Sequence, residues 1–160
     1  MSERGAIVTG GASGIGLATA RALLAEGWRV AICDRDPAAL DRVRGELAGR
    51  DGVSVQALDV ADAAAVATAV AEAEARIGPV RGLVNSAGIG HNVPFLEVDP
   101  AQFRRVLEVN LTGTFLVSQA AAKRIRANGG GAIVNISSIN GLRGSIGRTA
   151  YGASKGGVGC

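Results

Sequence analysis

The sequence predicts a single α/β domain over residues 1–160, in which helices cover both faces of a parallel sheet. Five short apolar stretches, at residues 6–8, 29–33, 53–58, 82–85 and 132–136, have the length of buried strands. Helical patterns separate these stretches, and a glycine-rich turn joins the first stretch to the first helix. Strands that alternate with helices become parallel through right-handed crossovers. We therefore expect a doubly wound, three-layer αβα sheet of the Rossmann type.

The helical patterns have recognisable ends. Asp36 and Asp99 each precede a proline, and an acidic cap followed by proline is typical of a first helical turn. Residues 62–76 form an alanine-rich helix. The pattern after Asp99 predicts one long helix to about residue 128, where three glycines stop it. Its expected buried stripe consists of Phe103, Val106, Leu107, Leu111 and Phe115.

Composition excludes several classes of protein. Hydrophobic residues make up 48% of the chain but aromatic residues only 3%, so aliphatic side chains must fill the core. The net charge of +3 comes from scattered arginines without a basic run, which argues against nucleic-acid or membrane partners. Cys33 and Cys160 do not form a disulfide framework, and no apolar stretch reaches the length of a membrane span. We expect a cytoplasmic protein without a metal site.

The glycine-rich turn contains Gly10, Gly14 and Gly16. A strand, a tight glycine turn and a helix together present backbone N–H groups and a helix N-terminus to a pyrophosphate. This spacing differs from the general G-x-G-x-x-G fingerprint of dinucleotide-binding proteins. By itself the glycine spacing of this sequence is also compatible with an ordinary turn that binds no nucleotide.

Acidic residues follow the second and third predicted strands. Asp34 lies where an acid accepts hydrogen bonds from the ribose hydroxyls of adenosine, and its charge disfavours the 2′-phosphate of NADP. Arg35 can pair with that phosphate, so NAD is preferred and NADP remains possible. The alternative is that both residues belong to a solvated turn. Asp59 and Val60 lie next to the expected adenine position, although Asp59 also suits a helix N-terminus.

Candidate catalytic residues lie mainly near the end of the chain. Tyr151 and Lys155 are four residues apart and share a helix face, and a nearby ammonium favours the phenolate form of a tyrosine. Such a tyrosine can exchange a proton with a carbonyl or alcohol oxygen. Ser138, at the end of the fifth strand, can bond the same oxygen. Asn110 falls in the buried stripe, where it bonds neighbouring backbone or holds a water or a helix bend.

Together these motifs resemble the short-chain dehydrogenase/reductase family over residues 5–157, and especially its 3-oxoacyl-carrier-protein reductases and sugar or alcohol dehydrogenases. The resemblance implies an NAD(P)-dependent oxidoreductase that acts on a small carbonyl or alcohol substrate. Tyr151 would be the general acid and base, while Lys155 would favour its phenolate and bind the nicotinamide ribose. Ser138 would orient the substrate oxygen, and Asn110 would position a water in a proton relay.

The resemblance also implies a set of cofactor-binding residues. They are Gly10, Ser13, Gly14, Ile15, Gly16, Asp34, Arg35, Asp59, Val60, Asn85, Ser86, Ala87, Gly88, Tyr151 and Lys155. Ser13 stands where NADP-preferring members often have a basic residue, which again favours NAD.

The sequence departs from the family pattern in two places. Ser86 replaces the second asparagine of the usual Asn-Asn-Ala-Gly turn. Family members also continue well beyond the lysine, so we expect a C-terminally truncated chain that lacks the last strands. Its fifth strand would be an exposed edge of the sheet. The helices that usually form the family's homo-oligomer would be incomplete. The three glycines in residues 156–160 are poor helix formers. The alternative function is a dinucleotide-binding module, or a partial product, without efficient turnover.

Overall fold

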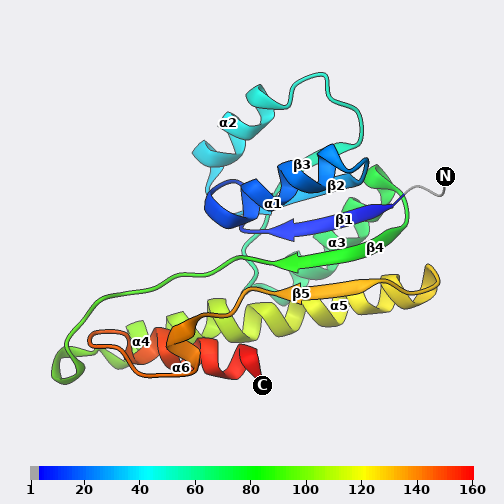
Figure 1. Ribbon diagram of the computed structural model, residues 1–160. Helices are drawn as coiled ribbons and strands as arrows, with labels where there is room; N and C mark the ends of the chain where they lie inside the picture. The colour runs from blue at the N-terminus through cyan, green and yellow to red at the C-terminus, as the bar shows by residue number, and fades with distance from the viewer. Residues whose placement is uncertain (1–3) are drawn as a thin grey trace.

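The computed structural model describes residues 4–160 as a five-stranded parallel sheet flanked by helices (Figure 1). The strands are β1 (Gly5–Thr9), β2 (Arg29–Asp34), β3 (Val53–Ala57), β4 (Val80–Asn85) and β5 (Ala132–Asn135). Their order in the sheet is β3-β2-β1-β4-β5, and every neighbouring pair is parallel. The predicted α/β fold and doubly wound topology are therefore confirmed.

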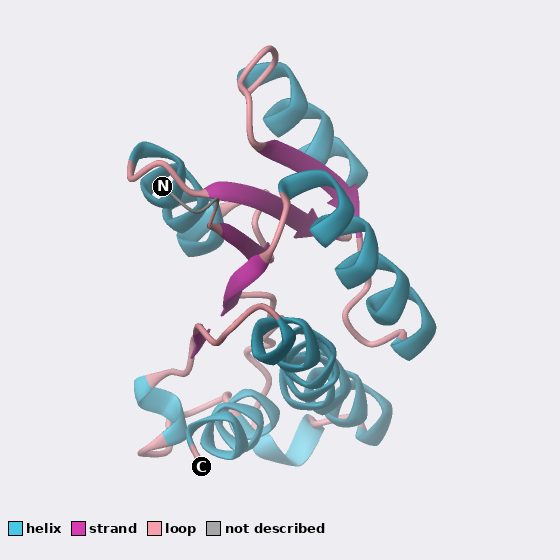
Figure 2. Cartoon of the chain, turned by 90° about the vertical axis from the view of Figure 1, so that its right-hand side faces the viewer, coloured by secondary structure: helices cyan, strands magenta, loops and turns pink. Residues whose placement is uncertain are grey.

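Two helical layers enclose the sheet (Figure 2). Helices α1 (Gly14–Ala25) and α2 (Pro37–Glu46) pack on one face, and α3 (Ala63–Ile77) and α5 (Gly113–Ala127) pack on the other. Successive residues of a strand point to opposite faces. In β1, Ile7 accordingly joins the core beneath α3 and α5, whereas Val8 joins the core beneath α1 and α2.

The two predicted acidic caps are present. The Asp36 carboxylate accepts the backbone N–H groups of Ala38 and Ala39 at the start of α2, at 3.0 and 3.2 Å. Asp99 accepts the N–H of Ala101 at 2.9 Å at the start of α4 (Pro100–Leu107). Each cap pairs donors that a first helical turn would otherwise leave without an acceptor.

The single long helix expected after Asp99 is interrupted. A π-helical turn, Glu108–Thr112, separates α4 from α5. Such a turn inserts extra residues into the helical repeat and rotates the face that follows it. Val117 and Ala121 therefore face the sheet, and Phe115 is 57% exposed. The prediction that Phe115 belongs to the buried stripe was wrong for this reason.

The glycine-rich end of the chain is helical after all. Helix α6 (Thr149–Gly159) packs against α4, the π turn and the 3₁₀ turn Ile139–Gly141. A Cβ on Gly157 would lie 3.0 Å from the Leu111 side chain, so the missing side chain permits this close approach. Tertiary packing thus outweighs the low helix propensity of the glycines. A second 3₁₀ turn, Phe95–Glu97, lies in the segment before α4.

Strand β5 is the edge of the sheet, as expected. It pairs with β4 on one side, and the structure of residues 4–160 places no strand on the other. Its apolar residues Ile133 and Val134 are 37% and 49% exposed. None of the helices over these residues has the length and apolar character needed to cross a membrane.

The two cysteines are expected to differ sharply in reactivity. Cys33 is 1% exposed in the core, and this burial raises the pKa of its thiol to about 11. Cys160 is exposed at the end of α6. A thiol reagent at pH 8 should therefore modify one thiol per folded chain and two in denaturant, as counted by mass spectrometry, because thiolate is the reactive form. Rapid modification of Cys33 in the folded chain would contradict the packing around β2.

Candidate active site

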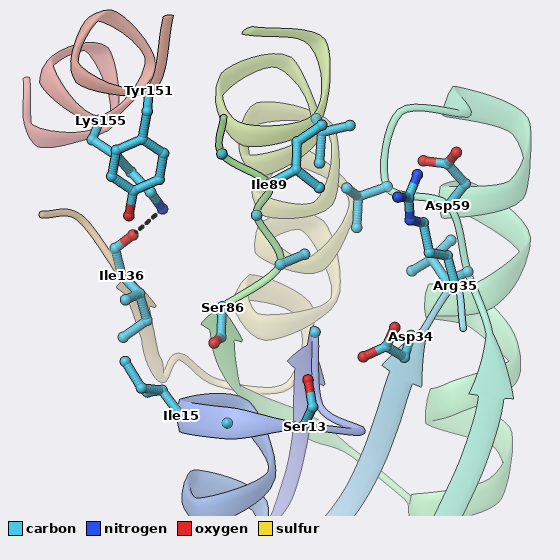
Figure 3. A pocket seen from close by; sticks show the side chains of 18 of the residues that line it. Ser13, Ile15, Asp34, Arg35, Asp59, Ser86, Ile89, Ile136, Tyr151 and Lys155 are labelled. Atoms are coloured by element: carbon cyan, nitrogen blue, oxygen red, sulfur yellow. Dashed lines mark hydrogen bonds between the residues drawn. The ribbon is translucent and has the colours of Figure 1, made fainter. Parts of the chain in front are cut away.

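A cleft of about 460 Å³ lies at the carboxyl ends of all five strands. Its lining includes residues that directly follow or end each strand: Gly10, Asp34, Leu58, Ser86 and Ile136. This is where open parallel sheets bind ligands. Figure 3 shows Tyr151 and Lys155 at one end of the cleft and Asp34, Arg35 and Asp59 at the other.

The cleft brings most of the predicted site residues together. Those that line it are Gly10, Ser13, Gly14, Ile15, Asp34, Arg35, Asp59, Val60, Ser86, Ala87, Gly88, Tyr151 and Lys155. Four other predicted residues, Gly16, Asn85, Asn110 and Ser138, are not part of its lining. Their positions behind the cleft surface are described below.

The glycine turn fits closely between β1 and β4. Gly10 has φ +60°, and a Cβ there would lie 2.8 Å from Cα of Ala87. A Cβ on Gly16 would overlap the carbonyl oxygen of Gly10, so Gly16 allows α1 to begin directly against the turn. Gly16 therefore shapes the turn and does not line the cleft.

The N-terminus of α1 is directed to the middle of the cleft. Ser13 precedes the helix, and its side chain makes no capping hydrogen bond. The first bond of the helix runs from the N–H of Leu17 to the carbonyl of Ser13. The amides at positions 14–16 therefore have no acceptor within the helix and are available to an anion.

Asp34 is held rigidly at the far end of the cleft. One carboxylate oxygen accepts the N–H of Ala12 in the glycine turn at 3.1 Å, and the other accepts the N–H of Asp36 at 3.1 Å. The acid at the end of β2 thus positions the glycine turn as well as facing the cleft.

Asp59 is charged and fixed by neighbours that the sequence pattern did not connect. It accepts the N–H of Ala61 at 3.0 Å and the guanidinium of Arg105, from α4, at 2.9 Å. The Ala61 amide, and then Arg105 with a further contribution from Arg35, hold the pKa of Asp59 below its usual range despite partial burial. The Asp59 site is therefore built from β3, α4 and the turn after β2.

Tyr151 and Lys155 lie on α6 at the opposite end, as their spacing predicted. The Lys155 ammonium is 5.9 Å from the centre of the Tyr151 ring. It donates a 2.6 Å hydrogen bond to the carbonyl oxygen of Ile136, which follows β5 (Figure 3). Burial lowers the pKa of Lys155. The lysine is thus fixed next to the phenol by a single backbone acceptor.

Asn110 lies in the π turn and is fully buried. Its side-chain oxygen accepts the N–H of Ile89 at 2.8 Å, and its amide donates to the Ile89 carbonyl and to Ser154 Oγ, both at 2.9 Å. Asn110 therefore joins three parts of the site: the segment after β4, the π turn and α6. Of the roles considered for it, bonding to neighbouring backbone is the one that these contacts display.

Ser138 and Asn85 also lie behind the lining. β5 ends at Asn135, so Ser138 does not end the strand as predicted and instead begins the following 3₁₀ turn, where its Oγ accepts the N–H of Asn140 at 3.2 Å. Asn85 is buried at the end of β4 and donates to Ser118 and Asn135 at 2.9 Å. The Asn85 side chain thus connects β4 to α5 and β5, whereas Ser138 caps its own 3₁₀ turn.

Several residues of the cleft were not foreseen. They are Leu58, Ile89, Gly90, Val109, Ile136 and Arg148. Most contribute apolar surface or backbone and have no distinctive sequence pattern. Arg148 has a spacing that could have identified it. It lies three residues before Tyr151, and this spacing places the side chains of Arg148 and Tyr151 on the same side of a helix near its start.

Comparison with known proteins agrees with this geometry. The short chain dehydrogenase family pattern matches residues 4–159. The 2-dehydro-3-deoxy-L-rhamnonate dehydrogenase (NAD(+)) of Sphingomonas sp. (strain SKA58) is 44% identical over 156 residues, covering 97% of this chain and 61% of that protein. Galactitol 2-dehydrogenase (L-tagatose-forming) of Cereibacter sphaeroides is 46% identical over 157 residues, covering 96% and 60%.

A solved structure shares the fold of this chain. A substituted actinorhodin polyketide ketoreductase with NADPH superposes with a TM-score of 0.92 at 37% identity, covering 98% of this chain and 61% of that one. The chain thus spans about three fifths of the length of the proteins that it matches.

Proposed function

Because the chain belongs to the short-chain dehydrogenase family, we propose that it serves hydride transfer between a nicotinamide dinucleotide and a small carbonyl or alcohol substrate. The observation that supports this most directly is the arrangement of one cleft, with the glycine turn at its middle and Tyr151 beside Lys155 at its end. A nicotinamide bound there supplies the two-electron chemistry, and the chain supplies the proton transfer and the binding contacts.

The residues present fit a dinucleotide. Free amides at the start of α1 suit a pyrophosphate, and Gly10 and Gly16 keep the turn clear of side chains. Asp34, Arg35 and Asp59 offer polar groups to the adenosine half. The volume of about 460 Å³ lies within the range of roughly 300–1,000 Å³ typical of ligand sites.

Tyr151 is the proposed general acid and base. In the oxidation direction its phenolate would take the hydroxyl proton of the alcohol, and an oxidised nicotinamide, when bound, would accept the hydride from the carbinol carbon as the C=O bond forms. The Lys155 ammonium places a positive charge 5.9 Å from the centre of the Tyr151 ring. Its bond to the Ile136 carbonyl keeps the ammonium in place. Asn110 positions Ile89 and α6 around this centre.

The proposed cofactor is NAD, because a carboxylate at Asp34 disfavours a 2′-phosphate. The test is a fluorescence titration of the purified chain with NADH and with NADPH. We expect saturable binding that favours NADH, and Asp34→Ala should reduce this preference by about tenfold, since it removes one charge next to the phosphate position. Asp36→Ala removes the same charge two residues away and should leave the ratio of the two affinities unchanged.

Each outcome of this titration has a distinct meaning. If neither nucleotide binds, the proposed function is wrong for this chain. If NADH binds but no carbonyl in a broad panel is reduced, the chain is a dinucleotide-binding module. An unchanged NADH/NADPH ratio in Asp34→Ala would contradict only the assigned role of Asp34.

A further inference from the structure

We propose that the substrate carries an anionic group, a carboxylate or a similar oxyanion, and that Arg148 binds it beside Tyr151. This inference rests on the proposed function, because it names the class of substrate for the same cleft. It is drawn from three observations: the position of Arg148, the charges that line the cleft, and a second cavity that shares Arg148 with it.

Arg148 is placed to contact a substrate at the reacting end of the cleft. Its guanidinium carbon lies 5.9 Å from the centre of the Tyr151 ring, and the residue lines the cleft. A Cβ on Gly90 would lie 3.4 Å from a guanidinium nitrogen, so the arginine is packed beneath the segment after β4. It is half-buried, and no carboxylate among residues 4–160 forms an ion pair with it.

The charged side chains that line the cleft next to Tyr151 are Arg148 and Lys155, and both are positive. The acidic residues that line the cleft, Asp34 and Asp59, lie at its opposite end (Figure 3). The carboxylates at that end are accompanied by Arg35 and by Arg105, which pairs with Asp59, whereas no carboxylate of residues 4–160 lines the cleft next to Arg148 and Lys155. A positive field of this kind attracts and orients an anion beside Tyr151.

A second cavity shares Arg148 with the cleft. It has about 360 Å³ and lies between the 3₁₀ turn after β5 and the start of α6. Arg148 lines both spaces, and Arg143, Asn140, Ser145 and Thr149 add further cationic or hydroxyl and amide groups to the second one. No acidic side chain lines it. A substrate whose oxygen faces Tyr151 can thus extend an oxyanion toward this cavity, where a guanidinium offers paired N–H donors.

The contact between Arg148 and the Tyr151 ring does not by itself account for these features. A cation–π contact supports the ring but leaves the N–H edge of the guanidinium free to bind. The pyrophosphate position at the start of α1 lies on the other side of the cleft from α6 (Figure 3). An anion that binds Arg148 is therefore best assigned to the substrate.

The test measures binding without turnover. The NADH-loaded chain is titrated calorimetrically with 2-, 3- and 4-hydroxybutyrate and with the neutral amide of each. Both NADH and the alcohol are reduced, so no hydride is exchanged. We expect at least one hydroxy acid to bind about tenfold more tightly than its amide, because only the acid forms a charge-assisted contact.

Variants identify the residue responsible. Arg148→Gln should remove the preference for the acid, and Arg148→Lys should retain part of it, because the lysine keeps the charge but not the paired donors. Arg126→Gln removes the same charge from an exposed position on α5 and should leave the preference intact. The inference would be overturned if every acid bound with the same affinity as its amide, or if the preference for the acid survived in Arg148→Gln. In either case NADH binding would still support the proposed function. If NADH does not bind, both fail together.

Discussion

Tyr151→Phe is expected to lower turnover by about 10²–10⁴-fold, the range typical for loss of a general acid or base. The substitution removes one oxygen atom and leaves the ring between Arg148 and Lys155. Binding contacts of the proposed cofactor should persist, so the affinity for NADH should remain within a few fold of the original. The measurement combines steady-state reduction of a carbonyl panel with NADH fluorescence titration.

The two measurements together separate a chemical role of Tyr151 from a structural one. Loss of turnover with NADH affinity kept means that the hydroxyl takes part in the proton transfer. Parallel loss of NADH affinity and turnover would instead mean that the hydroxyl supports the site rather than the proton transfer.

Asn110→Ala is expected to lower the free energy of unfolding by about 3 kcal/mol. The substitution leaves the N–H and carbonyl of Ile89 without their partner, whereas the Ser154 hydroxyl still donates to the Tyr151 carbonyl, and a buried group left unpaired costs about 1–3 kcal/mol. These penalties are not additive, because the segment after β4 can relax toward water. Urea denaturation followed by circular dichroism gives the value.

Matched variants make the Asn110 result specific. Asn110→Asp keeps the acceptor for the Ile89 N–H but loses both donors and buries a carboxylate beside the Ile89 carbonyl, so it should be at least as destabilising as Asn110→Ala. Gln119→Ala, on the exposed side of α5, should change stability by less than about 0.5 kcal/mol. A loss below about 1 kcal/mol for Asn110→Ala would mean that the π turn and the segment after β4 are held by other contacts.

The sequence predicts the sheet well because its signals are local. Apolar stretches such as 29–33 and caps such as Asp36 depend on residues within a few positions, and the order of the strands follows from their alternation with helices. The same locality explains the failure at Phe115. A π turn of five residues changes which face of the following helix packs on the sheet. The apolar pattern before the turn does not indicate this change.

Remote contacts were the other part that the sequence pattern did not predict. Asp59 was placed next to the cofactor site, but its partner Arg105 lies 46 residues away in the sequence. An ion pair between residues so far apart produces no periodic pattern in the sequence. Ser138 illustrates a boundary error, since it was placed at the end of the fifth strand but lies three residues beyond Asn135, where β5 ends. Residue type and spacing indicate which side chains gather in the cleft; the fold decides which of them face it.

The central position of β1 has a consequence for how the chain is made. Within residues 4–160 β1 precedes the other strands, yet it pairs with β4, so Thr9 meets Asn85 only after the 75 residues between them have been synthesised. Contacts of such large sequence separation slow folding, because the intervening chain must be ordered before they form. Until then the apolar edge of β1 is exposed in the nascent chain. We therefore expect the nascent chain to be prone to aggregation until β4 has been synthesised.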